Sequence, residues 1–362
     1  PITDTAGIIE DVRVLSTKVH EISSTSRSHP VDRVAVIGGA GYLGSVLSRQ
    51  LLDAGYEVVI LDRLLFGTTG IDAIIDDPDL TLIEGDMRHI EAVVDAVRHV
   101  DAVIHLGGLV GDPASAVDAE ETLEQNLHAT RLIATIAKYH QVSRFIFAST
   151  CSVYGQAEAP ETLLDEEAPL HPVSLYAQTN IQSEQVLAEL TDATFAPTIL
   201  RMATLFGLSP RMRFDLVVKL LTAKAQHEWV SPIHGGSQFR PNVHVRDAAR
   251  AYVAMLEAPF EAVAGEVFNV GTNEQNHAII EIGEIVQTVL PEADLQVDAT
   301  SDDPRSYQVD FGKIYQQTHF ETRETIAGGV TEIAEALYDG RFTDYTDTRY
   351  NNYRRTIAAL DD

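Results

Sequence analysis

The sequence predicts an α/β protein with a doubly wound parallel β-sheet and a smaller lobe built mostly from C-terminal residues. From Val34 onward, short apolar runs alternate with segments of helical length, which is typical of βαβ units. The first apolar run leads straight into a glycine-rich turn before a helix. After Phe206 this regularity falls, because segments rich in Pro, Gly and Arg interrupt it. We therefore expect the chain to leave the sheet there and form a lobe.

A length of 362 residues suits two units or one large domain with a smaller lobe. We expect an N-terminal extension over residues 1–30, with an amphipathic helix at about 7–22. The sheet domain is expected to comprise residues 31–205 and 242–271. The smaller lobe is expected to comprise residues 206–241 and 272–362.

Each predicted strand is a short apolar run of the kind found in buried parallel sheets, and each predicted helix has apolar residues at helical spacing. The strands are expected at residues 34–38, 57–62, 80–86, 101–106, 144–150, 197–203 and 266–271. The helices between them are expected at residues 42–54, 90–97, 122–139, 176–190 and 215–224. The remainder after residue 271 is expected to form helices and loops.

The formal net charge of −28 argues against several classes of partner, since such a surface repels nucleic acid and anionic membranes. A salt-rich habitat would produce the same acidic, Lys-poor composition. No apolar segment is long enough to span a bilayer, and residues 1–30 lack the features of a secretory signal, so a cytoplasmic location is expected. The single cysteine, Cys151, excludes an intramolecular disulfide, and we predict no metal site.

The glycine-rich turn is the first functional signal. Gly38, Gly41 and Gly44 follow a strand and precede a helix, so that the backbone can approach a pyrophosphate at the helix N-terminus. The next strand ends in Asp62, which is placed to accept hydrogen bonds from the adenosine ribose. This pattern predicts a Rossmann-type dinucleotide site. Asp62 would repel a 2′-phosphate and so favours NAD over NADP, although the adjacent Arg63 keeps NADP open.

Further residues are expected at the same pocket because ligands of open α/β sheets bind at the carboxyl ends of the strands. Asp86 would reach the adenine, and the small Gly107 and Gly108 would let the cofactor lie against the chain. The remaining predicted contacts from these turns are Tyr42, Leu43, Met87 and Leu106.

The runs FIFASTCSVYG and SLYAQTN resemble the extended short-chain dehydrogenase/reductases, which include nucleotide-sugar epimerases and dehydratases, and the resemblance covers about residues 34–320. It implies that Thr150 is the catalytic hydroxyl and Tyr176 the acid/base. The family's lysine falls at Asn180, one helical turn beyond Tyr176. Tyr176 and Asn180 are also expected to contact the cofactor.

Asn180 changes the expected chemistry, because the lysine ammonium lowers the pKa of the catalytic tyrosine and holds the nicotinamide ribose. An asparagine can hydrogen-bond the ribose but supplies no charge. Three alternatives follow: Tyr176 works at a higher pKa, another cation substitutes for the lysine, or the chain is an inactivated variant.

The resemblance also implies a substrate site. QFRPN places Arg240, and DDPRSYQVD places Arg305 and Tyr307, beside a nucleotide diphosphate, with Thr204 as a further candidate. An acidic protein that binds a diphosphate needs a local positive site. Arg211 and Arg213, together with Arg240 and Arg305, would form it. The alternative is that the arginines only neutralise nearby carboxylates.

The resemblance predicts an NAD-dependent epimerase of a nucleotide-sugar, which oxidises a sugar hydroxyl transiently and reduces the ketone again. A sugar or carbonyl reductase, and a silent NAD- or nucleotide-sugar-binding protein, are the alternatives. Dehydration is disfavoured because Cys151 and Ser152 stand where dehydratases carry Asp and Glu. A homodimer through residues 122–139 and 176–190 is also implied. The nucleotide and the sugar are not predicted.

Overall fold

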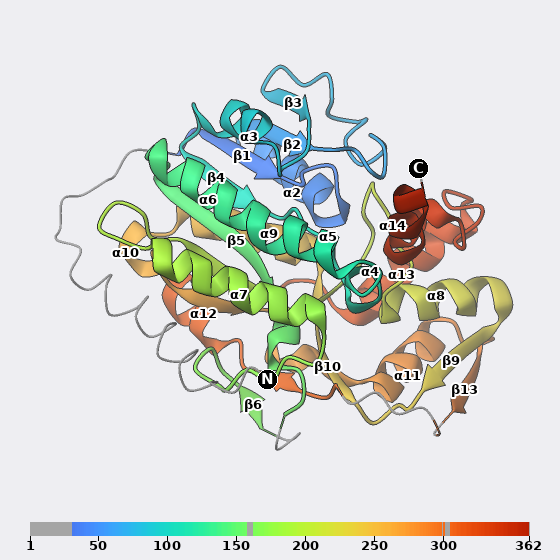
Figure 1. Cartoon of the computed structure of the whole chain (residues 1–362). Helices are drawn as coiled ribbons and strands as arrows, with labels where there is room; N and C mark the ends of the chain where they lie inside the picture. Colours follow the sequence, from blue (N-terminus) through green and yellow to red (C-terminus); the bar gives the residue numbers. More distant parts are fainter. Residues whose placement is uncertain (1–30, 158–161, 299, 301–304, 362) are drawn as a thin grey trace.

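A parallel seven-stranded sheet forms the centre of the molecule (Figure 1). The computed structural model describes residues 31–157, 162–298, 300 and 305–361. Across the sheet, the strands run in the order β11 (Val267–Val270), β7 (Thr198–Met202), β5 (Arg144–Thr150), β4 (Ala102–His105), β1 (Arg33–Ile37), β2 (Glu57–Asp62) and β3 (Leu80–Glu84). Every neighbouring pair is parallel, which confirms the predicted fold class.

Helices cover both faces of this sheet because successive strand residues point to opposite sides. In β1, Val34 and Val36 belong to one buried cluster, whereas Ala35 and Ile37 belong to the other. The first cluster includes residues of α2 (Tyr42–Asp53) and α9 (Val245–Glu257), which pack on each other. The second includes residues of α3 (Ile90–Val97), α6 (Ala129–Tyr139) and α7 (Leu175–Leu190).

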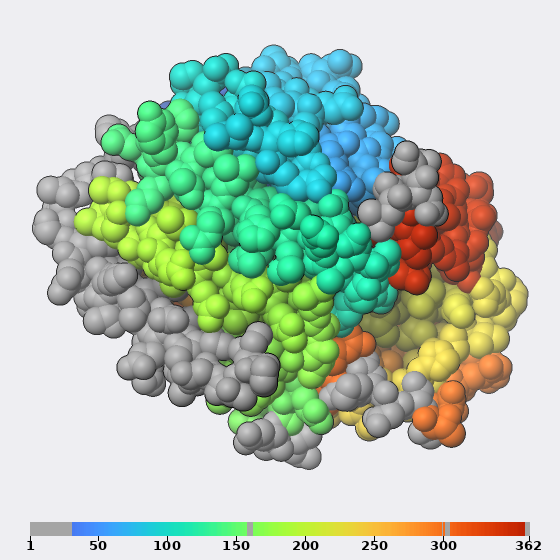
Figure 2. Space-filling view, in the orientation of Figure 1, coloured from blue at the N-terminus to red at the C-terminus, as the bar shows by residue number. Residues whose placement is uncertain are grey.

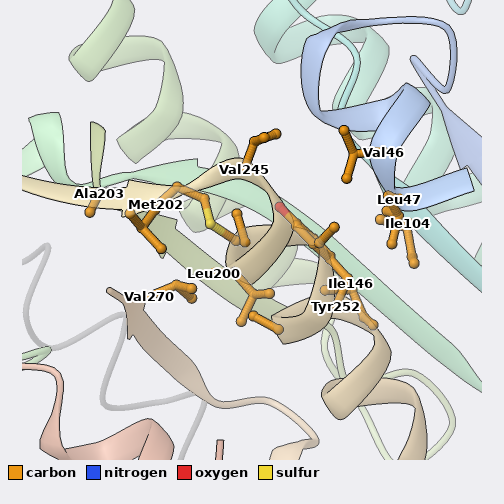
Figure 3. Packing of buried hydrophobic residues seen from close by; sticks show 14 of the residues in the cluster. Val46, Leu47, Ile104, Ile146, Leu200, Met202, Ala203, Val245, Tyr252 and Val270 are labelled. Carbon is orange, nitrogen blue, oxygen red and sulfur yellow. The ribbon is translucent and has the colours of Figure 1, made fainter. Parts of the chain in front are cut away.

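Figure 3 shows part of the first cluster, with side chains from α9 beside side chains from the strands. Val245 and Tyr252 of α9 lie near Ile146 and Leu200 of two neighbouring strands. All four residues are at most 1% exposed. This packing holds the chain that returns after Phe239 firmly against the sheet.

The helix expected over residues 122–139 contains a wide turn that the sequence did not predict. It consists of α5 (Ala119–Leu123), a π-helical turn at Glu124–His128, and α6. Asn126, in the wide turn, both accepts a hydrogen bond from the Leu109 amide and donates one to the Leu109 carbonyl. The turn thus directs a polar side chain at the loop after β4, a tertiary contact that helical periodicity does not encode.

The rest of the chain contains more strand than expected. β8 (Thr204–Phe206), β10 (Phe239–His244) and β12 (Asn276–Ala278) form a three-stranded sheet. Two parallel pairs join β9 (Val230–His234) with β13 (Asp294–Asp298), and β6 (Leu163–Leu164) with β14 (Gln308–Val309). The expectation of helices and loops alone after residue 271 was therefore wrong. These strands are short and partly exposed, and so lack the apolar runs that mark buried strands.

The remaining helices surround these small sheets. They are α4 (Asp112–Ser115), α8 (Val217–Glu228), α10 (Phe260–Val263), α11 (Ile279–Val289), α12 (Gly312–Thr318), α13 (Ile326–Tyr338) and α14 (Asn352–Asp361). Among the residues described, no helix combines the length and apolar character needed to cross a membrane. The helix expected within residues 7–22 lies outside the described residues.

Candidate active site

The glycine turn after β1 leaves room that only glycine provides. Gly38 has a φ of 83°, and a Cβ there would lie 2.9 Å from the Gly107 amide nitrogen. A Cβ at Gly44 would lie 2.2 Å from the Gly38 carbonyl oxygen. The turn therefore packs closely against both α2 and the loop after β4, and leaves an open backbone cradle at the N-terminus of α2. This cradle fits the pyrophosphate of a dinucleotide.

Asp62 ends β2 and is held by the same turn. Its two carboxylate oxygens accept hydrogen bonds from the amides of Ala40 and Leu64, at 3.0 and 2.8 Å. Burial raises the pKa of Asp62, although these hydrogen bonds act in the opposite direction. Each carboxylate oxygen retains a further lone pair, so Asp62 can still accept hydrogen bonds from ribose hydroxyls.

Asp86 belongs to a charged group next to this position. Arg88 donates to both oxygens of Asp86, and its Nη1 lies 2.8 Å from Glu121. Arg63 lies 4.0 Å from Asp86 and 3.9 Å from Glu121. Since Arg63 already faces two carboxylates, its charge is largely compensated within the protein, which weakens the case for a 2′-phosphate there.

These residues line one pocket along the carboxyl edge of the sheet. Of the predicted cofactor contacts, the pocket contains Gly38, Gly41, Tyr42, Leu43, Gly44, Asp62, Arg63, Asp86, Met87, Leu106, Gly107, Gly108 and Tyr176. It runs from the turn after β2 to Tyr176 at the start of α7. The pocket is therefore continuous from the proposed adenosine end to the proposed catalytic end.

The catalytic end is built by the end of β5 and the first turn of α7. Ser174 caps α7 by accepting a hydrogen bond from the Ala177 amide, which fixes Tyr176 in the first turn. Burial raises the pKa of Tyr176 to about 12, and a hydrogen bond with the Thr150 side chain opposes part of that shift. The Asn180 side chain donates to the Tyr176 carbonyl at 2.9 Å. Thr150, Tyr176 and Asn180 thus lie together.

The predicted substrate residues form a second group that does not line this pocket. Arg305 pairs with Asp112, and Asp112 also accepts a hydrogen bond from Ser174 at 2.6 Å. Arg240 donates to the Arg305 carbonyl, and its guanidinium lies 5.7 Å from the ring centroid of Tyr307. Thr204 pairs with Asn242 in the β8–β10 ladder. Through Ser174, the group is connected to the start of the helix that carries Tyr176.

Other residues that line the pocket were not predicted as cofactor contacts. Among them are Phe66, Arg211, Arg213, Asn352 and Thr356. Only Arg211 and Arg213 of these five have a signal in the sequence, since they belong to the predicted local positive site. Asn352 and Thr356 come from the last helix, in a segment without a recognisable motif.

Cys151 is buried, as its position at the end of a strand suggested. It is 1% exposed, and its thiol donates to the Arg201 carbonyl at 3.2 Å. Burial raises the pKa of this thiol. Cys151 therefore has neither the exposure nor the acidity needed for proton transfer to a substrate.

Comparisons with known proteins agree with this geometry. Residues 34–271 match the model of the NAD dependent epimerase/dehydratase family. The chain is 31% identical over 265 residues to UDP-glucose 4-epimerase of Bacillus subtilis, covering 66% of this chain and 77% of that protein. It is 26% identical to dTDP-glucose 4,6-dehydratase of Streptomyces niveus over 324 residues, covering 85% of this chain and 94% of that protein.

The fold is also similar to that of a solved epimerase. UDP-glucuronic acid 4-epimerase from Bacillus cereus, in complex with UDP-glucuronic acid and NAD, superposes with a TM-score of 0.76 at 22% identity. The similarity covers 85% of this chain and 99% of that chain. The glycine cradle, Asp62 and the Thr150–Tyr176 pair occupy the span that the family model matches, and the chain belongs to the NAD-dependent epimerase/dehydratase family.

Proposed function

We propose that this protein is a nucleotide-sugar epimerase, an isomerase that retains its NAD between catalytic cycles. The observation that carries the proposal is the continuous pocket from the glycine cradle to Tyr176, with Thr150 beside the tyrosine hydroxyl. A proton-transfer pair at the end of a dinucleotide site suits the oxidation and reduction of a sugar hydroxyl at one carbon.

In this proposal Tyr176 removes the proton of the sugar hydroxyl and later returns it. Thr150 forms a hydrogen bond with the Tyr176 side chain and so holds the tyrosine hydroxyl in position. Bound NAD supplies the hydride acceptor and donor. Because no cation stands at residue 180, the raised pKa of Tyr176 makes proton removal the difficult step at neutral pH.

The surroundings of β5 favour epimerisation over dehydration. Elimination of water from a sugar needs an acid for the leaving hydroxyl as well as a base. The two positions expected to supply those groups hold Cys151, which is buried and bonded to a backbone carbonyl, and Ser152. Neither side chain is a carboxylate.

The substrate clamp is proposed to be formed by Arg240 and Arg305, with Tyr307 and Thr204. In this arrangement residues 31–205 and 242–271 provide most of the dinucleotide site, and residues 206–241 and 272–362 provide most of the sugar-nucleotide site. Arg211, Arg213, Asn352 and Thr356 of the second part nevertheless line the dinucleotide pocket. Asp112 pairs with Arg305 in the structure, so a substrate diphosphate would compete with Asp112 for this guanidinium.

We also propose a homodimer that uses the face formed by α6 and α7. Figures 1 and 2 show these two helices side by side along one side of the molecule, in green and yellow-green. Tyr139, at the end of α6, is 81% exposed, which fits a residue that a second chain covers.

The function is tested by identifying small molecules released from the denatured protein by mass spectrometry, followed by assays with UDP-, dTDP- and GDP-sugars. The proposal expects co-purified NAD and interconversion of epimers without net change in absorbance at 340 nm. Net NADH consumption or production with one substrate would indicate a reductase or dehydrogenase instead. Binding without turnover of any sugar nucleotide would indicate a silent binding protein.

A further inference from the structure

Three basic side chains are buried together at one side of the pocket, and two carboxylates, Asp215 and Asp62, act electrostatically on them. Arg211, Arg213 and Lys219 are 4%, 6% and 0% exposed. Asp215 pairs with Arg213 at 2.6 Å. Among the described residues, Arg211 Nε and Lys219 Nζ have no hydrogen-bond partner. Burial lowers the pKa of Lys219, and lowers that of Arg211 to about 9, so an anion bound at this place would stabilise the charged forms of these side chains.

The two arginines of this cluster line the dinucleotide pocket. Arg211 lies close to the glycine turn, with Gly70 between them. A Cβ added to Gly70 would lie 3.0 Å from the Arg211 Cβ and 2.5 Å from the carbonyl oxygen of Ala40 in the turn. The Arg211 guanidinium stacks on Phe66, with its carbon 3.5 Å from the ring centroid. Both arginines also act electrostatically on Tyr42, the first residue of α2. They therefore stand close to the helix N-terminus, where a pyrophosphate is expected.

The C-terminal segment holds this cluster in place. The side-chain oxygen of Asn352 accepts a hydrogen bond from Arg211 at 2.7 Å, and the backbone amide of Asn352 donates to Asp215 at 2.9 Å. Arg355 donates to the carbonyl of Leu65, another pocket-lining residue, at 2.8 Å. Asn352 and Thr356 themselves line the pocket. Helix α14 thus links the arginine cluster to the turn after β2.

The arrangement of the segment in space agrees with these contacts. Helix α14 packs against α4, and Figure 2 shows the C-terminal residues, in red, between the N-terminal part of the chain, in blue, and the region of α8, in yellow. Phe214, next to Arg213, packs edge-to-face against Phe342, Tyr345 and Tyr350 of the same segment. These aromatic contacts anchor the segment next to Arg213.

We propose that Arg211 and Arg213 bind the diphosphate of the dinucleotide, and that the C-terminal segment, residues 339–358, acts as a clasp that positions Arg211 and slows release of the cofactor. The clasp adds charged contacts to a phosphate site that is otherwise made of backbone amides. The proposal rests on dinucleotide binding, which is a property of the family, and does not depend on which sugar reaction the enzyme performs.

Ligands with and without phosphate test the arginine contact in the full-length protein freed of cofactor. Affinities for ADP and adenosine are measured by displacement of NADH fluorescence. Arg211→Gln is expected to weaken ADP binding by about 10- to 100-fold, the usual effect of losing a hydrogen bond between charged groups. Adenosine affinity should change by less than about twofold, since adenosine carries no phosphate, and Arg211→Lys should retain part of the ADP affinity.

Arg349→Gln is the matched control, because Arg349 lies in the same C-terminal segment but is 62% exposed, pairs with Asp347, lies over the Tyr350 ring and does not line the pocket. It removes the same charge without touching the pocket and should leave ADP affinity unchanged. Equal weakening of ADP and adenosine by Arg211→Gln would show that Arg211 only supports the fold of the pocket. Unchanged ADP affinity would also overturn the proposal.

The clasp has its own test, which remains available if Arg211→Gln does not fold. Asn352→Ala removes the acceptor that holds Arg211 and should accelerate NAD release by about 10-fold, measured by exchange of labelled NAD. Arg349→Gln again serves as control. An unchanged release rate in Asn352→Ala would show that the C-terminal segment does not retain the cofactor. Because both readouts are binding measurements, they stay valid if no sugar nucleotide is turned over.

Discussion

Asn180 lies where the family's lysine is expected. Its side chain donates to the Tyr176 carbonyl and, by a hydrogen bond with the Tyr176 side chain, lowers the pKa of the tyrosine slightly, but it carries no charge. The tyrosine hydroxyl therefore lacks the adjacent ammonium that would oppose the effect of burial on its pKa, which stands at about 12. Of the alternatives raised by the sequence, the first, a tyrosine working at raised pKa, agrees with this geometry. The positive charge of Arg213 lowers the pKa of Tyr176, but Arg213 is also paired with the Asp215 carboxylate.

Asn180→Lys should raise the rate of hydride transfer at neutral pH by one or more orders of magnitude. A group with a pKa near 12 is deprotonated in only a small fraction of molecules at pH 7, so the rate of the unmodified enzyme should rise with pH toward that value. The lysine should move this profile to lower pH. Single-turnover kinetics of both forms across pH measures the shift. Fast turnover of the unmodified enzyme at pH 7, with a slower Asn180→Lys variant, would instead show a divergent active site.

We predict that Asp62 determines the preference for NAD over NADP. We expect NAD to bind more tightly than NADP, and Asp62→Ala to narrow the difference by removing both ribose hydrogen bonds and repulsion of the 2′-phosphate. The substitution also frees the Ala40 and Leu64 amides. The ratio of the two affinities is therefore the useful readout, since loosening of the turn affects both cofactors alike. Equal affinities in the unmodified protein would place Asp62 away from the ribose.

Helix α7 is fixed to the sheet by a buried ion pair as well as by apolar contacts. Glu184 of α7 and Arg201 of β7 are each 1% exposed and lie 2.8 Å apart. Ser149 of β5, one residue before Thr150, donates to Glu184 at 2.5 Å. This network joins the helix that carries Tyr176 to the strand that carries Thr150, so the distance between these two predicted catalytic residues depends on it.

Glu184→Ala should therefore destabilise the protein by about 3–5 kcal/mol, because it leaves a buried guanidinium without its carboxylate. Glu189→Ala on the same helix is the control: Glu189 is 64% exposed, pairs with Arg131 on the surface, and should contribute at most about 1 kcal/mol. Urea unfolding measures both free energies. Similar losses in the two variants would mean that the buried pair does not hold α7 in place.

The elements show why some of the site could be predicted and some could not. Strands with continuous apolar runs, such as β1 and β2, show in the sequence where they end, so the glycine turn and Asp62 could be predicted from local patterns. Thr150 was predicted from the family resemblance. Asn352 reaches the pocket only through tertiary contacts of α14, a polar helix at the far end of the chain. No local periodicity or turn motif encodes such a contact, and its residues were assigned to the substrate lobe instead.

At the scale of the whole molecule, the charge of −28 sets the conditions for assembly. Two copies repel each other at low salt, whereas at molar salt the Debye length falls to about 3 Å and this repulsion is screened. The exposed residues of α6 and of the π-helical turn before it are mostly polar: Glu124, His128, Arg131 and Thr135 precede Tyr139. An interface on this face would therefore have a small apolar contribution and a strong dependence on salt.

We predict that the homodimer dissociates more readily at physiological than at molar salt, as measured by light scattering over a range of protein concentrations. Tyr139→Asp should shift the equilibrium toward monomer, because it places a further negative charge at the proposed interface. Tyr338→Asp is the matched control, since Tyr338 is 82% exposed on α13, away from α6 and α7. A monomer at both salt concentrations would exclude the dimer. Equal effects of the two substitutions would show that the subunits do not meet through α6, and that the change acts only through total charge.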